Sequence, residues 1–216
     1  MFLLMEKAKR VALGVLLGSL IVGGVTFVCV EASADDLELR VSADVQHQHT
    51  EGGVIVLGQE HRLQLEDVRL NKTLTNLGAQ YRLTSWLSAG TVYSTVVARD
   101  AGAWSLEHRP YADVVASTSL FSLDFTLRPR VEYRVEGGDA SFRIRKELRV
   151  EFSEIPTSPF ISDEVFVSTG GDVQRNVISL GLSPIEGLST FYSLETNFND
   201  VTEYKNIIGL DYRFNP

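Results

Sequence analysis

The stretch that decides the fold runs from Phe121 to Val135 and reads FSLDFTLRPRVEYRV. Apolar residues occupy every second position, with Pro129 filling the one gap, and polar or charged residues stand between them. Because side chains alternate between the two faces of a β-strand, this strand has one apolar face and one strongly charged face. A strand of a transmembrane barrel needs this pattern, since its outer face contacts lipid and its inner face lines a polar lumen. The stretch predicts a membrane barrel and says little about an activity.

The rest of the chain after residue 36 reads as further strands separated by turn residues, without a helical period. Eleven candidate strands follow one another at roughly 12–17 residues, which fits antiparallel hairpins without crossover helices. Single-chain bacterial barrels have an even number of strands. We therefore expect an all-β, closed antiparallel up-and-down transmembrane β-barrel of about ten strands, with an irregular first segment. Twelve strands are the alternative count, and a soluble β-sandwich is the competing architecture.

The first 34 residues have the order of a secretory signal peptide. Lys7, Lys9 and Arg10 precede an apolar run over residues 11–30, and an Ala-Ser-Ala cleavage site ends at Ala34. We expect a signal peptide over 1–34 and a barrel over 35–216, exported through the inner membrane of a Gram-negative bacterium into its outer membrane. An uncleaved signal anchor is the alternative, because the apolar run of about 20 residues is long enough to span a bilayer.

Composition excludes several classes of function. The only cysteine, Cys29, lies in the signal segment, so the mature chain has no thiol for a disulfide or a zinc–thiolate site. The formal net charge of −8 argues against a nucleic-acid partner. His47 and His49 stand two residues apart, but no further His or Cys completes a metal site around them. With no G-x-S-x-G motif either, we expect no catalytic residue, cofactor or metal.

The charged faces of neighbouring strands suggest a network inside the barrel. The residues assigned to this lumen charge network are Arg62, Arg109, Arg128, Arg130, Glu132, Arg134, Arg143, Arg145, Glu147, Arg149, Glu151 and Glu164. The interior of a small barrel has room for side chains or for a narrow passage, so arginines and carboxylates that pair across it would fill it. A structural or assembly-related role follows. The alternative is a small anion-selective porin for acidic solutes, since rings of Arg or Lys select anions. An outer-membrane lipid-modifying hydrolase is the second alternative.

The opposite faces of the same strands are expected to contact the lipid bilayer, which would be the main partner. The residues predicted to face lipid are Phe121, Leu123, Phe125, Leu127, Phe142, Ile144 and Leu148. Lys146 interrupts this apolar face. Leu210, Tyr212 and Phe214 alternate at the C-terminus, which resembles the terminal signature that barrels present to the assembly machinery, although Asn215 and Pro216 follow here.

Several stretches carry a family resemblance. They are GQEHR (58–62), LGAQYRL (77–83), RP (109–110), RPRVEYR (128–134), RIR (143–145), PFISDEVF (159–166), Arg175 and the segment 204–214. Read in this order, they resemble an uncharacterised bacterial outer-membrane β-barrel family catalogued only as a domain of unknown function. The resemblance implies an outer-membrane barrel. It supplies no activity and no catalytic residue.

Overall fold

The computed structural model describes residues 37–66, 68–100, 102–198 and 202–214, and all regular elements in these ranges are β-strands. The strands are β1 (Leu37–Thr50), β2 (Gly53–Gln64), β3 (Arg69–Arg82), β4 (Leu87–Asp100), β5 (Ala103–Leu120), β6 (Leu123–Glu136), β7 (Asp139–Phe152), β8 (Pro159–Ser168), β9 (Val173–Ile185), β10 (Leu188–Phe198) and β11 (Thr202–Phe214). The described residues contain no helix that is long and apolar enough to cross a membrane. The signal peptide predicted over 1–34 lies outside the described residues.

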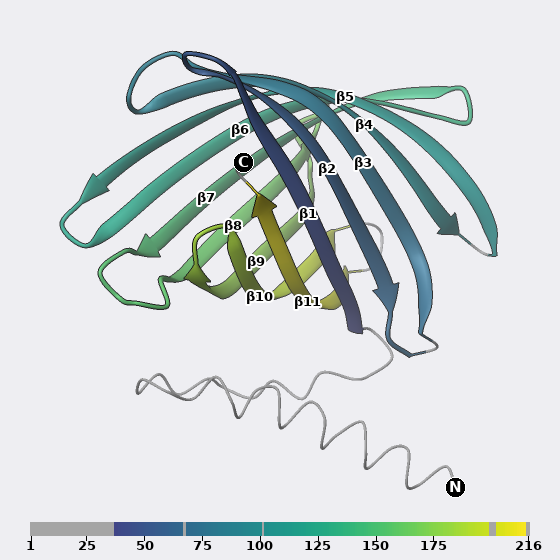
Figure 1. Cartoon of the computed structure of the whole chain (residues 1–216). Helices are drawn as coiled ribbons and strands as arrows, with labels where there is room; N and C mark the ends of the chain where they lie inside the picture. The colour runs from purple at the N-terminus through teal and green to yellow at the C-terminus, as the bar shows by residue number, and fades with distance from the viewer. Residues whose placement is uncertain (1–36, 67, 101, 199–201, 215–216) are drawn as a thin grey trace, which may run out of the picture.

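The eleven strands form one closed barrel. Each strand pairs antiparallel with its neighbours in sequence, and β1 closes the sheet by pairing with β11 in parallel (Figure 1). The closed all-β barrel is therefore confirmed. The expected number of ten or twelve strands is wrong, because the first segment is no irregular lead-in: Leu37 to Val45 pairs residue by residue with β11.

The odd number of strands explains the parallel seam. Strands that alternate in direction around a ring can all be antiparallel only if their number is even. With eleven strands, β1 and β11 point the same way, and Leu37 pairs with Asn206 while Val45 pairs with Phe214. As a result β1 begins at one end of the barrel, here called the N-terminal end, and β11 finishes at the other, the C-terminal end (Figure 1).

Short turns connect the strands. Gly137 and Gly138 join β6 to β7 with φ angles of 60° and 98°, the conformation that a two-residue hairpin turn requires. Phe121 was expected within a lipid-facing strand, but it lies in the turn between β5 and β6 with φ 55° and 92% exposure. The reason lies in β5, which continues to Leu120, where Ser119 Oγ donates to Asp124 Oδ1 at 2.5 Å across the hairpin.

The two faces of the sheet differ in chemistry. On β6 and β7 the large apolar side chains of Leu127, Val131 and Phe142 point outward and are 48%, 51% and 51% exposed. Glu132 and Arg143, which lie at positions of opposite parity on these strands, point inward and are buried. The alternation read from the sequence thus holds in the structure, and the barrel is apolar outside and charged inside.

Aromatic rings help to fill the interior where glycines make room for them. Phe160 of β8 pairs in register with Gly181 of β9, and a Cβ atom at Gly181 would lie 2.4 Å from Cζ of Phe160. Phe191 of β10 pairs with Gly209 of β11, where a Cβ would lie 1.9 Å from its Cζ. These contacts are tight enough that only glycine fits opposite each ring.

Candidate functional site: a charged network inside the barrel

Glu132 on β6 is the centre of the network. Its carboxylate is fully buried. It accepts two hydrogen bonds from Arg143, from Nε at 2.9 Å and from Nη2 at 2.5 Å, and a third from Arg145 Nη1 at 3.2 Å. The guanidinium of Arg130 lies 3.6 Å away. β7 supplies two of these arginines because it pairs with β6 in a register that sets Glu132 opposite Arg143. One carboxylate is thus shared by three guanidinium groups.

Phe166 on β8 supports the same arginines from the other side. Its ring is 2% exposed, and the guanidinium carbons of Arg143, Arg145 and Arg175 lie 4.9, 4.8 and 3.8 Å from its centroid. A cation above an aromatic face is attracted by the ring quadrupole, and more strongly when water is excluded. Arg145 also donates from Nε to Glu164 at 2.6 Å. The ring and the carboxylates together hold the guanidinium groups in fixed positions.

Two carboxylates of β5 bind the arginines of β6. Glu107 accepts hydrogen bonds from Arg134 at 2.5 and 3.1 Å and from Arg109 at 3.0 and 2.8 Å. Asp113 accepts from Arg128 Nε at 2.8 Å and pairs with Arg130 at 3.4 Å. Both carboxylates are buried, and each of them compensates two guanidinium charges, of which those of Arg128 and Arg134 are 31% and 28% exposed.

A second cluster of charges lies near the parallel seam. Glu38 of β1 is 2% exposed and pairs with Lys205 of β11 at 2.5 Å and with Arg62 of β2 at 3.6 Å. Arg62 also donates from Nε to Glu60 at 2.5 Å, and Arg40 approaches Glu60 at 3.7 Å. The pair between Glu38 and Lys205 therefore ties the first strand to the last at the point where the barrel closes.

The ion pair between Arg149 and Glu151, toward the C-terminal end, is partly exposed. Arg149 pairs with Glu151, donates to Ser183 Oγ at 3.0 Å and lies 3.6 Å above the ring of Phe160. The side chains of Arg149 and Glu151 are 27% and 26% exposed. Glu147 lies on the same inward face of β7, and within the described ranges it makes no ion pair or side-chain hydrogen bond.

The structure brings all twelve residues of the predicted network to the inner face, with some of the expected partners and some others. We expected the arginines of β6 and β7 to be held mainly by Glu132, Glu147, Glu151 and carboxylates across the lumen, including Glu164. Glu132, Glu151 and Glu164 pair with the arginines of β7, whereas those of β6 pair mainly with Glu107 and Asp113. Phe166 and Glu38 were absent from the prediction. Phe166 has the same parity as Glu164 along β8, which is a signal that the sequence contains.

His47, His61 and His108 have outward parity, and His49 lies at an irregularity in the β1–β2 pairing near the C-terminal end. His61 Nδ1 lies 3.1 Å from Thr73 Oγ1, and His108 Nδ1 lies 2.6 Å from the Tyr93 hydroxyl. Within the described residues, no group of three or more His, Cys, Asp or Glu side chains could hold a metal ion. Among the described residues, neither of these two histidine contacts forms a catalytic triad, because no acidic side chain is seen to orient the histidine beside the hydroxyl group.

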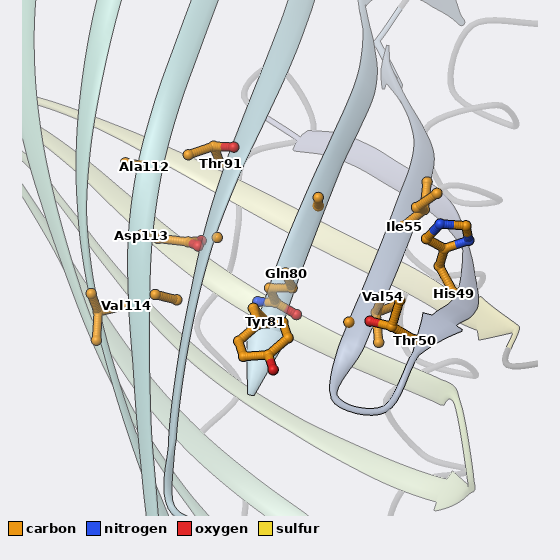
Figure 2. A pocket seen from close by; sticks show the side chains of 14 residues that line it. His49, Thr50, Val54, Ile55, Gln80, Tyr81, Thr91, Ala112, Asp113 and Val114 are labelled. Atoms are coloured by element: carbon orange, nitrogen blue, oxygen red, sulfur yellow. The ribbon is translucent and has the colours of Figure 1, made fainter. Parts of the chain in front are cut away.

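A hollow of about 530 Å³ lies against β1 to β5 near the C-terminal end (Figure 2). His49, Tyr81 and Asp113 are its titratable lining residues, and His49 and Asp113 stand on opposite sides of it (Figure 2). Asp113 is already engaged by Arg128. Most of the remaining lining consists of small or apolar side chains such as Ala79 and Ala112. The hollow therefore lacks the paired groups that acid–base chemistry needs.

The fold and its interior define the class of the protein: a closed all-β barrel whose interior is filled by arginine–carboxylate ion pairs. The chain belongs to the family described as "Protein of unknown function (DUF2490)", whose match covers residues 30–216. This confirms the resemblance to an uncharacterised family, and the description assigns no activity. Neither the curated proteins nor the solved structures contain a match to this chain.

Proposed function

We propose that the protein is an integral β-barrel of the bacterial outer membrane whose interior is closed by its own charged side chains, with a structural or assembly-related role. The proposal covers the lipid bilayer as the principal partner, export by a cleaved signal peptide, and recognition of the C-terminal strand by the barrel-assembly machinery. It has no catalytic step and no cofactor.

One observation carries the proposal: the apolar and charged faces are reversed relative to a protein folded in water. Exposed large apolar side chains occur around the whole barrel, from Leu57 and Leu77 through Leu106 and Leu180 to Leu210. Monomeric soluble proteins rarely expose contiguous apolar patches larger than a few hundred Å². Burial of such surface in lipid is favourable by roughly 25 cal/mol per Å², so a bilayer stabilises this outer face.

The closed sheet supports the same environment. Hydrocarbon offers no hydrogen-bond partner to a free strand edge, so a spanning β-structure must close. The pairing of β1 with β11 satisfies that condition, and the ion pair between Glu38 and Lys205 adds a side-chain contact across the same two strands. β11 also ends in alternating outward aromatics, with Tyr212 and Phe214 44% and 47% exposed.

The packed interior favours a closed barrel over a pore. Glu132, Phe166 and Ile207 come from three different parts of the chain and are at most 2% exposed. Each arginine of the network has a carboxylate partner, so these cations carry little uncompensated charge toward a passing anion. The barrel would then serve as an anchor or a scaffold in the membrane.

The proposal is tested by fractionation of the cell membranes, followed by a conductance measurement on the purified protein in a planar bilayer. The protein should be found in the outer-membrane fraction, resist extraction by carbonate, and give no steady single-channel current after reconstitution into a planar bilayer. Recovery in a soluble fraction would contradict the membrane location. A steady wild-type current would contradict the closed interior.

A small anion-selective porin is the second candidate, and one observation favours it. Lys72 points inward beside Arg62 and makes no ion pair or side-chain hydrogen bond within the described part of the chain. The Nε donor of Arg175 is also buried without a hydrogen-bond partner among these residues. Arg175 is paired with Glu195 at 3.3 Å, so Lys72 is the one of these two cations without a carboxylate partner in the described ranges, and such a cation attracts anions. Two results would establish this alternative. The wild-type protein would carry a current whose reversal potential in a salt gradient shows anion selectivity, and this current would be smaller in Lys72→Gln.

A further inference from the structure

Two opposite charges interrupt the outer face of the barrel. Lys146 on β7 has the parity of the exposed Phe142 and Leu148, and Asp163 on β8 has the parity of the exposed Ile161. Both side chains are exposed. Within the described strands, the other Arg, Lys, Asp or Glu side chain with outward parity is Arg99, the penultimate residue of β4. Lys146 and Asp163 are thus the charges set within the apolar outer face.

Both residues lie midway between the ends of the barrel. Lys146 is the eighth of the 14 residues of β7, and Asp163 is the fifth of the 10 residues of β8. The β7–β8 register pairs Lys146 with Val165, and Asp163 lies two residues before Val165 on the same face of β8. If the barrel spans a membrane, these two charges lie at the depth where lipid tolerates them least.

The two charges do not neutralise each other within one copy of the chain. Lys146 makes no ion pair or hydrogen bond with any residue that the structure describes, and no ion pair joins it to Asp163. Asp163 instead accepts a hydrogen bond from the side-chain amide of Asn176 at 2.5 Å. A lysine and a carboxylate that stay unpaired at this depth would each need a partner from outside the barrel.

We propose that this outer face, formed by β7 and β8 and centred on Val165, is the interface of a homodimer in the membrane. The inference rests on the proposed membrane location. A two-fold axis perpendicular to the bilayer keeps every atom at its own depth, so a charge can be met only by an opposite charge at a similar depth. Lys146 and Asp163 are at similar depth on adjacent strands, and Lys146 of each copy would therefore meet Asp163 of the other.

The surroundings of the two charges suit such a contact. Ile161, Leu148 and Ile178 lie next to them on β7 to β9 and are 44%, 48% and 46% exposed. A symmetric contact between the two faces would form two ion pairs inside a ring of apolar side chains. Charged pairs that are enclosed in this way fix register and partner choice. The patch is complementary to itself, which favours a second copy over an unrelated protein.

The test is charge exchange in the protein purified from membranes in mild detergent, with mass measured by sedimentation equilibrium. We expect the wild type to be a dimer, Lys146→Glu and Asp163→Lys each to be monomers, and the double exchange to regain the dimer. Arg99→Glu, which removes an outward cation at a strand end, is the matched control and should stay dimeric.

Cysteine cross-linking provides a second measurement that does not depend on charge. Cys29 is the only cysteine in the sequence, so Val165→Cys places a thiol near the proposed axis with little background. Oxidation of intact cells should give a covalent dimer for Val165→Cys and none for Leu77→Cys on β3.

The outcomes separate the interface from the membrane location. Wild type that inserts into membranes but is monomeric would overturn the interface alone, as would a dimer that persists in Lys146→Glu. Cross-linking of Leu77→Cys as strong as that of Val165→Cys would also overturn it. Wild type that never enters the membrane fraction would overturn the proposed function, and the interface with it.

Discussion

Removal of one buried carboxylate should destabilise the barrel strongly. Glu132→Gln keeps the shape of the side chain and deletes the charge that Arg143 and Arg145 contact by three hydrogen bonds. After the change Arg145 keeps Glu164 as a partner and Arg130 keeps Asp113. Arg143 keeps no carboxylate partner among the described residues, and its side chain is 9% exposed.

The magnitude follows from that difference. The loss is equivalent to one broken buried ion pair, so the free energy of unfolding should fall by about 3–5 kcal/mol. Glu151→Gln is the matched control, because the Arg149–Glu151 pair is 27% and 26% exposed and Arg149 keeps Ser183 and the ring of Phe160. Its cost should be about 1 kcal/mol or less.

The assay is urea unfolding of the protein folded in lipid vesicles, followed by tryptophan fluorescence of Trp86 and Trp104 and fitted by linear extrapolation. The slope of the transition should be the same for wild type and both variants. A loss below about 1 kcal/mol for Glu132→Gln would refute the reasoning, because a solvated pair in a wet pore contributes no more than that. Equal losses for the two variants would refute it as well.

Three further predictions concern the outer face, the interior packing and export. Val131→Arg, near the middle of β6, should reduce folding stability in vesicles by about 2–4 kcal/mol, whereas Phe125→Arg, the third residue of that strand, should cost about 0–1 kcal/mol; equal costs would argue against a bilayer around β6. Gly209→Ala places a methyl group where the ring of Phe191 lies and should lower the free energy of unfolding by about 1–3 kcal/mol in urea titrations. The double variant that also carries Phe191→Leu should recover stability, and a further loss in that variant would contradict the packing argument. N-terminal sequencing of the outer-membrane protein should begin at Asp35, and a sequence that includes the apolar run would contradict cleavage.

The fold could be predicted from the sequence because alternation is a local property. Each strand shows its apolar and polar faces within its own residues, as Leu127 and Arg128 do on β6. Phe121 also fits the alternation, yet it lies in a turn. The last residue pair between β5 and β6 is Leu120 with Leu123, so the hairpin bends at the two residues between them. The pattern itself indicates eleven strands, and the expected even number was wrong because an odd barrel can close through a parallel β1–β11 pair, which no local pattern reveals.

The charged interior was predictable in composition and only partly in pairing. The arginines of β6 alternate with Glu132 in the sequence, which suggested Glu132, the carboxylates of β7 and others across the lumen such as Glu164 as partners. Side-chain partners across a barrel depend on the register between strands, and the β5–β6 register places Asp113 opposite Arg130. Turn lengths and bulges set that register, so Asp113 and Glu107 could be assigned only once the strands were paired.

The most direct test of a barrel that faces lipid outside and holds its charges inside is site-directed spin labelling along β6 in vesicles. Labels at successive positions from Leu127 to Glu132 would be compared for collision with dissolved oxygen, which concentrates in lipid, and with a water-soluble nickel chelate. We expect a period of two, with oxygen contact high at Leu127 and Val131 and both probes restricted at Arg130 and Glu132. High nickel contact at Leu127 and Val131 would contradict it.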